Sequence, residues 1–241
     1  MKVSFIIPTF NEAKGIVTTL AQFKDLRRID HEVIVSDNGS TDNTIALARQ
    51  VGAQVVVRPS DTKTTIGECR NRGARAASGD ILWFIDADVH LVDSEATVQE
   101  VLAYFSDHQS TVASTMRITI YPEENKWIDS VIYAYFNALV YLQNRVFKTG
   151  ASPGDCMMIR RRDFERVYGF KPKLPTAEDF ELFSRLAKVG EIGYFWHRKV
   201  AMSPRRIRRD GWPKVLWLWW RNWWNQVVLG KVSHTDWEAR R

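Results

Sequence analysis

Residues 81–88 read ILWFIDAD, and this stretch decides the fold class. Five consecutive apolar residues, Ile81 to Ile85, followed at once by Asp86 and Asp88, indicate a strand that is buried on both faces and ends in two carboxylates. Parallel α/β sheets are built from such strands and bind their ligands at the carboxyl ends. The two aspartates are therefore expected at the ligand-binding edge of a largely parallel sheet.

Toward the N terminus, apolar runs alternate with segments of helical pattern. This alternation predicts a sheet whose two faces are covered by helices. We expect strands over residues 3–8, 32–37 and 54–58, and helices over residues 11–23, 44–51 and 66–77.

Beyond residue 90 the pattern is less regular, but it contains no internal repeat and no Gly/Ser-rich linker. It predicts one domain, residues 1–210, followed by a C-terminal appendage, residues 211–241. We expect helices over residues 94–108, 127–145, 178–188 and 212–229, strands over 111–120 and 156–160, and one or two strands within 191–203.

The composition is that of a folded soluble protein, with 45% hydrophobic and 26% charged residues in a chain of 241. It argues against a disordered chain or a coiled coil. No apolar run approaches the ~18 residues of a membrane-spanning helix, and no signal peptide is expected from the N-terminal MKVSFIIP. The two cysteines, Cys69 and Cys156, lie far apart, which disfavours a disulfide framework or a zinc site and fits a reducing compartment.

Polar clusters follow three of the predicted strands: PTFNE from Pro8, DNGS from Asp37, and Asp86-Ala87-Asp88. Neither GxGxxG nor GxxxxGK[ST] accompanies them, which disfavours a nicotinamide enzyme or a P-loop protein. Two carboxylates directly after a buried strand are suited to hold Mg²⁺ or Mn²⁺ against phosphate oxygens. The alternative is a solvated acidic turn.

Two further charged clusters have both a functional and a structural interpretation. Glu178 and Asp179 form a second acidic pair, which by itself is typical of a helix N-terminus, where carboxylates favour the helix dipole. Arg205 and Arg206 follow Ser-Pro; they are suited to grip a diphosphate, or they form a solvated basic turn.

Taken together and in order, these motifs resemble the family 2 glycosyltransferases, which have the GT-A fold. The likeness spans roughly residues 3–211 and departs from the family pattern at Tyr168, where relatives have the first glycine of GGF. The resemblance implies a Rossmann-like, mostly parallel mixed sheet flanked by helices, here with a C-terminal amphipathic helix. It rests on six segments: VSFIIPTFNEA, EVIVSDNGSTDNT, RNRGARAASGDILWFIDADV, GDCMMIRRRDFERVYGF, AEDFELFSRL and SPRR.

The resemblance also implies a role for each matching residue. A nucleotide pocket would be lined by Pro8, Thr9 and Glu12, with Asp37 bonding the base and Arg70 and Asn71 near the nucleotide. Asp86 would lie against the ribose or the metal, and Asp88 would ligate the metal. Asp179 would be the general base with Glu178 beside it, and Arg205 and Arg206 would face the diphosphate.

The function expected from this resemblance is inverting, metal-dependent hexosyl transfer. The donor would be a nucleotide-diphosphate sugar, with UDP favoured and GDP or dTDP as alternatives. The acceptor would be a hydroxyl or phosphate group, lipid-linked if the protein works at a membrane surface. The alternatives are a nucleotidyltransferase of similar architecture and a non-catalytic subunit that binds sugar nucleotides.

The C-terminal segment differs from the rest of the chain. Residues 1–204 hold 25 basic and 25 acidic residues, whereas residues 205–241 hold nine basic and three acidic ones. Six of the ten tryptophans fall between Trp212 and Trp224. A basic helix with a tryptophan-rich face is typical of membrane interfaces. We therefore expect residues 211–230 to dock peripherally on the cytoplasmic face of the cell membrane, with packing on the body or in a dimer as the alternative and no nucleic acid as a partner.

Overall fold

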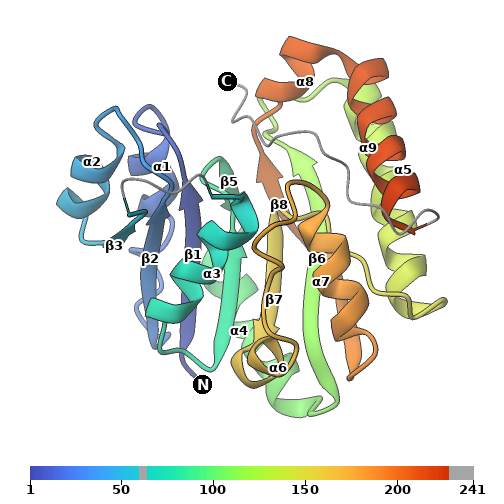
Figure 1. Cartoon of the computed structure of the whole chain (residues 1–241), viewed down its shortest axis with the longest axis horizontal. Helices are drawn as coiled ribbons and strands as arrows, with labels where there is room; N and C mark the ends of the chain where they lie inside the picture. Colours follow the sequence, from blue (N-terminus) through green and yellow to red (C-terminus); the bar gives the residue numbers. More distant parts are fainter. Residues whose placement is uncertain (60–63, 228–241) are drawn as a thin grey trace.

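The computed structural model describes residues 1–59 and 64–227. Its centre is a single sheet (Figure 1) formed by β1 (Val3–Thr9), β2 (His31–Asp37), β3 (Gln54–Val57), β4 (Ile81–Ile85), β5 (Val89–Leu91), β6 (Thr111–Ile120), β7 (Cys156–Arg160) and β8 (Glu191–Met202). The spatial order of the eight strands is β3-β2-β1-β4-β7-β6-β8-β5.

The sheet is mixed, with most strands running in one direction. β1 pairs in parallel with β2 and β4, β2 with β3, and β6 with β8. β7 is antiparallel to both β4 and β6, and β5 is antiparallel to β8. The predicted fold class is therefore confirmed. Because β7 is antiparallel, its first residue, Cys156, pairs with Ile85 at the end of β4.

Helices cover both faces because neighbouring residues of a strand point to opposite sides. On one face, Phe5 and Trp83 pack with α1 (Ile16–Ala21), α4 (Ser94–Asp107) and α5 (Trp127–Arg145). On the other face, Ile6 and Phe84 pack with α3 (Ile66–Ala76), α6 (Arg161–Arg166) and α7 (Glu178–Leu186). The remaining helices are α2 (Thr44–Gln50), α8 (Arg205–Asp210) and α9 (Trp212–Val227).

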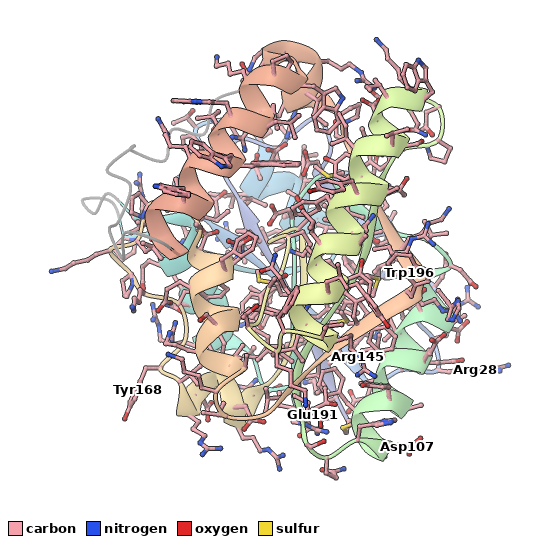
Figure 2. All side chains as sticks on the ribbon, turned by 90° about the vertical axis from the view of Figure 1, so that its right-hand side faces the viewer. Arg28, Asp107, Arg145, Tyr168, Glu191 and Trp196 are labelled. Atoms are coloured by element: carbon pink, nitrogen blue, oxygen red, sulfur yellow. The ribbon has the colours of Figure 1, made fainter. Side chains whose placement is uncertain are left out.

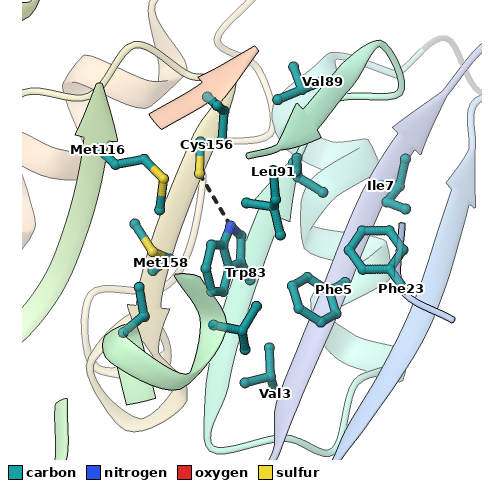
Figure 3. Packing of buried hydrophobic residues seen from close by; sticks show 14 of the residues in the cluster. Val3, Phe5, Ile7, Phe23, Trp83, Val89, Leu91, Met116, Cys156 and Met158 are labelled. Carbon is teal, nitrogen blue, oxygen red and sulfur yellow. Dashed lines mark hydrogen bonds between the residues drawn. The ribbon is translucent and has the colours of Figure 1, made fainter. Parts of the chain in front are cut away.

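Trp83 lies at the centre of the first core (Figure 3). Its indole N–H donates to the Cys156 sulfur at 3.2 Å, which satisfies the one polar group of an otherwise apolar, fully buried side chain. Cys69 and Cys156 are both buried and free, so no disulfide joins them.

The sequence-based element prediction was wrong in a few places. The helix expected from residue 11 begins only at Ile16, because Asn11 adopts a left-handed conformation with φ of 53°. The Asn11 carboxamide oxygen instead accepts the Thr41 N–H at 2.6 Å, so it ties two loops together. β5, α6 and α8 were not predicted. The prediction of one or two strands within residues 191–203 is confirmed: residues 191–202 form one strand, interrupted by a bulge over residues 196–198.

The C-terminal helix α9 lies beside α5 (Figure 1). The Trp212 indole donates to Asp129 at 2.6 Å, and the Trp219 ring lies 5.1 Å from that of Phe136. The predicted aromatic face of α9 is thus divided, since Trp212 and Trp219 pack on the body whereas Trp217 and Trp220 are exposed. Residues 228–241 of the predicted appendage lie outside the described residues.

Candidate active site

A cleft with a volume of about 930 Å³ opens at the edge where β1 and β4 end. This is the edge at which open α/β sheets bind their ligands. The structure brings most of the sequence-predicted site residues to this cleft, since its lining includes Pro8, Thr9, Glu12, Arg70, Asp86, Asp88, Glu178, Asp179, Arg205 and Arg206.

Asp37 lies behind the wall of the cleft. Its side chain is fully buried, and one carboxylate oxygen accepts the N–H groups of Gly39 and Ser40 at 2.9 and 2.8 Å. The other oxygen accepts the Thr9 hydroxyl at 3.0 Å. In this arrangement Asp37 shapes the loops after β1 and β2, and the neighbouring Asn38 takes a place in the lining.

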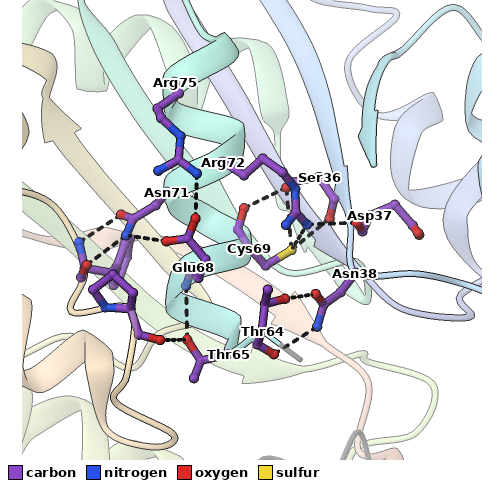
Figure 4. Close-up of polar contacts among 12 residues, drawn as sticks. Ser36, Asp37, Asn38, Thr64, Thr65, Glu68, Cys69, Asn71, Arg72 and Arg75 are labelled. Atoms are coloured by element: carbon purple, nitrogen blue, oxygen red, sulfur yellow. Dashed lines mark hydrogen bonds and ion pairs between the residues drawn. The ribbon is translucent and has the colours of Figure 1, made fainter. Parts of the chain in front are cut away.

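Asn71, on α3, is not part of the cleft lining and contacts the loop that contains Phe170; Figure 4 shows its polar contacts. Its amide N–H donates to the Phe170 carbonyl at 2.8 Å, and its oxygen accepts the Phe170 N–H at 2.9 Å. Both polar ends of the buried side chain are therefore used to hold that loop. The prediction that Asn71 lies near the nucleotide stays a prediction.

Arg70 is the central cation of the site. It is almost fully buried, and its guanidinium donates to Asp86 at 2.8 Å, to Glu178 at 2.7 Å and to the Gly154 carbonyl at 3.1 Å. Burial acts to lower the pKa of Arg70, but the charges of Asp86 and Glu178 outweigh it and raise the pKa. Arg70 therefore joins the turn after β4 to the start of α7.

Asp179 lies in the first turn of α7 with only 9% of its surface exposed. One carboxylate oxygen accepts the Phe180 N–H at 2.9 Å. The other oxygen faces Gly154, where a Cβ atom would lie only 2.7 Å from it. Burial, followed by the adjacent charge of Glu178, raises the pKa of Asp179 to about 7. A carboxylate with such a pKa is suited to accept a proton near neutral pH.

Arg205 lies on the opposite side of the turn Asp86-Ala87-Asp88, called the DxD turn below, and its guanidinium bridges two carboxylates. Its guanidinium donates to both Glu12 oxygens at 3.1 and 3.2 Å and to Asp88 at 3.0 Å. Burial and the nearby charge of Asp86 raise the pKa of Asp88 to about 6, although Arg205 partly offsets them. Arg205 is half exposed, so a bound anion has access to it.

Asp155 is a further acidic residue of the cleft that the sequence analysis missed. Burial and the charges of Asp86 and Asp88 raise its pKa well above the ordinary value. The residue directly precedes β7, so it reaches this edge only because β7 is antiparallel. The available signal in the sequence was an aspartate, Asp155, directly before an apolar strand.

The acidic cluster bears on metal binding. Among the described residues, no three His, Cys, Asp or Glu side chains are placed to hold a metal ion by themselves. Burial, followed by the charges of neighbouring carboxylates, raises the pKa values of Asp88 and Asp155, and a hard divalent cation with oxygen ligands would offset the repulsion between these carboxylates. The residues therefore fit a cation whose coordination is completed by phosphate oxygens of a ligand.

The model of the family described as Glycosyl transferase family 2 matches residues 4–168. The chain is 29% identical over 117 residues to poly(ribitol-phosphate) beta-N-acetylglucosaminyltransferase TarS of Staphylococcus aureus, in an alignment that covers 46% of this chain and 20% of TarS. It is 24% identical over 217 residues to the O-antigen chain rhamnosyltransferase RfbN of Salmonella typhimurium, covering 87% of this chain and 69% of RfbN. The chain thus spans about a fifth of the length of TarS.

Solved structures show the same fold. The mannosyltransferase PcManGT from Pyrobaculum calidifontis, in complex with GDP-Man and Mn²⁺, gives a TM-score of 0.66 at 21% identity, with 86% of this chain and 60% of that chain covered. TarS residues 1–349, in complex with UDP-GlcNAc, gives 0.64 at 20% identity, with 83% and 57% covered. Both are similar to this chain in fold.

Proposed function

The chain belongs to glycosyltransferase family 2, and we propose that it transfers a hexosyl group from a nucleotide-diphosphate sugar to an acceptor hydroxyl, with inversion at the anomeric carbon. Support for this class of donor comes from the structures similar in fold, which hold GDP-Man in PcManGT and UDP-GlcNAc in TarS. A UDP-sugar and a GDP-sugar are therefore the first donors to test.

The observation that carries the proposal is a chain of contacts that links the turn Asp86-Ala87-Asp88 to the adjacent carboxylates of Glu178 and Asp179. Arg70 contacts Asp86 with one end of its guanidinium and Glu178 with the other, and Asp179 is adjacent to Glu178. Glycosyl transfer needs a site for a diphosphate beside a carboxylate that accepts a proton. In the cleft, Arg205 and Arg206 are suited to bind the diphosphate, and Asp179 is suited to accept the proton.

The chemistry follows from these positions. The acceptor hydroxyl gives its proton to Asp179, and its oxygen forms a bond to the anomeric carbon. The bond from that carbon to the diphosphate oxygen breaks on the opposite face, and the electron pair leaves with the nucleoside diphosphate. Arg205, which now pairs with Glu12 and Asp88, and Arg206 beside it are suited to face the diphosphate.

Asp88 and Asp86, with Asp155 beside them, are the residues that would hold a divalent cation, Mg²⁺ or Mn²⁺. When bound, it would stabilise the negative charge that develops on the leaving group. The presence of Mn²⁺ in the PcManGT complex supports this part of the proposal.

The direct test is hydrolysis of a panel of UDP-, GDP- and dTDP-sugars without acceptor, in Mn²⁺, in Mg²⁺ and in EDTA. We expect the sugars of one nucleotide to be hydrolysed, and hydrolysis to be faster with a divalent ion. Binding of that nucleotide sugar should also raise the melting temperature by mass action. A protein that binds no nucleotide sugar under any of these conditions would contradict the proposal. Synthesis of a nucleotide sugar from sugar phosphate and nucleoside triphosphate would favour a nucleotidyltransferase instead.

We also propose that the protein docks peripherally on the cytoplasmic face of the cell membrane. No helix within the described part of the chain is long and apolar enough to cross a bilayer. On α9, however, Trp217 and Trp220 are 54% and 56% exposed, and the guanidinium of Arg221 lies 4.8 Å from the Trp217 ring (Figure 2 shows this side of the molecule). Exposed tryptophan beside arginine suits the interface of an anionic membrane.

The docking test is co-sedimentation with vesicles made of equal parts phosphatidylglycerol and phosphatidylcholine. We expect a double Trp217→Gln, Trp220→Gln variant to stay in the supernatant and the unaltered chain to pellet. Trp196→Gln is the matched control, since Trp196 is also exposed, at 41%, but lies on β8. Equal recovery of all three proteins in the pellet would rule out docking through α9.

A further inference from the structure

The cleft continues beyond the catalytic carboxylates, into the space between α5 and α9. α8 contacts the DxD turn through Arg205, and α9 leads away from it along α5. The character of the lining changes in that direction, from carboxylates to the apolar side chains of Ile132, Phe136, Leu139, Val215, Leu218 and Trp219.

The chemistry of the proposed donor does not explain this apolar section. A nucleoside, a diphosphate and a sugar are polar, and they are accounted for by the residues around β1, β4 and the start of α7. Apolar walls bind a ligand only when that ligand brings apolar surface out of water. Leu139 remains 37% exposed although it lines the cleft, so the section is open to a ligand.

A basic group lies where the apolar section begins. Arg209 and Lys214 line the cleft there and share a single acidic partner, Asp210, at 3.3 and 3.4 Å. Even with Arg206 left to the donor's diphosphate, positive charge exceeds negative charge at this point. An anionic group between the carboxylates and the apolar walls would be attracted there.

We infer that the acceptor is a long-chain lipid with a phosphate in its headgroup and a free hydroxyl beyond that phosphate. The chain lies between α5 and α9, the phosphate lies at Arg209 and Lys214, and the hydroxyl reaches Asp179. The inference rests on the proposed function, whose reaction it uses unchanged: the hydroxyl oxygen is glycosylated, its proton goes to Asp179, and the lipid phosphate is not altered.

The outer surface of α5 offers such a lipid a route from a bilayer. An exposed apolar stripe runs along the helix, with spacings of three or four residues that place its members on one side. Leu139 belongs both to this stripe and to the cleft, so the two surfaces are continuous. The stripe consists of Trp127, Val131, Tyr135, Leu139, Leu142 and Val146.

The test is calorimetric titration of the full chain with octyl phosphate, hexyl phosphate, octyl glucoside and inorganic phosphate. The three alkyl compounds are used below their critical micelle concentrations. Each methylene moved from water into an apolar site strengthens binding about three- to fourfold, so octyl phosphate should bind about tenfold more tightly than hexyl phosphate. Octyl glucoside, which has the chain without the charge, should bind at least about tenfold more weakly than octyl phosphate.

Two substitutions then locate the site. Leu139→Asp should weaken octyl phosphate binding at least about tenfold, because it places a carboxylate in the apolar section. Val17→Asp is the matched control: it is also an aliphatic residue on the exposed side of a helix, α1, with similar exposure, 41% against 37%, but it belongs neither to the cleft nor to the stripe on α5. Binding to this variant should change less than about twofold.

The outcomes separate the inference from the proposed function. Equal affinity for octyl and hexyl phosphate, with competition by inorganic phosphate, indicates a site for free phosphate and overturns the lipid. If octyl glucoside binds as tightly as octyl phosphate, the anionic headgroup is overturned. If the two variants lose octyl phosphate affinity equally, the location is overturned. Each of these leaves donor hydrolysis as it was, whereas failure to bind or hydrolyse any nucleotide sugar removes the proposed function on its own.

Discussion

Replacing Asp179 by Asn should slow turnover and at the same time stabilise the protein. Burial and the charge of Glu178 raise the pKa of Asp179 from 3.8 to about 7, so ionisation costs free energy in the folded state. Between about pH 4 and pH 7 the unfolded chain releases a proton that the folded chain keeps, so stability falls as pH rises through this window. Asn has no proton to release, and its oxygen still accepts the Phe180 N–H.

The size of the gain follows from the shift. One pKa unit corresponds to about 1.4 kcal/mol, so a shift from 3.8 to about 7 gives an upper limit of about 4 kcal/mol. For a chain of this size, with about 2–4 °C for each kcal/mol, the melting temperature at pH 8 should rise by at most roughly 8–16 °C. At pH 5 the folded protein keeps the Asp179 proton but the unfolded chain has largely released it, so the gain in melting temperature should be less than half of that at pH 8.

The assay combines thermal unfolding at pH 5 and pH 8 with turnover at saturating donor. Turnover of the unaltered protein should rise with pH up to about 7, as the base loses its proton, and Asp179→Asn should lower it by at least ~10²-fold. A variant that melts lower at pH 8, or gains equally at both pH values, would refute the burial argument. Unchanged turnover would refute the assignment of the base.

A control on the same helix should behave in the opposite way. Burial acts to raise the pKa of Glu181, but hydrogen bonds from Arg185 and Lys171 outweigh it and lower the pKa. A lowered pKa means that the ionised form stabilises the fold above the ordinary pKa and that this stability is lost on acidification. Glu181→Gln should therefore lower the melting temperature at pH 8 and leave turnover unchanged.

Asp88→Asn should abolish the stimulation of donor hydrolysis by Mn²⁺ while the melting temperature without metal does not fall; stimulation equal to that of the unaltered protein would show that the metal binds elsewhere. Arg70→Met should destabilise the fold by about 3–5 kcal/mol in urea unfolding at pH 8, because Asp86 and Glu178 lose their buried partner; a loss below about 1 kcal/mol would mean that solvent replaces the guanidinium. Gly154→Ala should lower turnover far more than donor affinity, since the new Cβ displaces the Asp179 carboxylate, and an equal loss in both would contradict this.

Much of the fold could be predicted from local patterns. A strand that is buried on both faces is apolar at nearly every position. The strands ILWFI and VSFII can therefore be predicted from their sequences alone. Because parallel strands end at the same edge, the side chains after β1 and β4 were bound to be neighbours. Asp86, Asp88 and Glu12, which follow these two strands, do line one cleft.

The direction in which a polar side chain points is not encoded so locally. Asp37 and Asn71 match the family motifs as well as Asp88 does, yet both turn inward to satisfy backbone N–H groups of nearby loops. A buried loop requires partners for its polar groups, and the nearest carboxylate or amide supplies them. Only the packed structure shows which polar residues are used in this way.

The same limit applies to residues that meet from distant parts of the chain. Asp155 joins the acidic cluster because β7 runs antiparallel, and strand direction is set by long-range pairing rather than by the residues of the strand. On α9, helical periodicity gave a single aromatic face, but contact with α5 divides it into Trp219 toward the body and Trp220 toward solvent. A repeat of 3.6 residues fixes which side chains share a side of a helix, whereas the neighbouring helix decides which of them are covered.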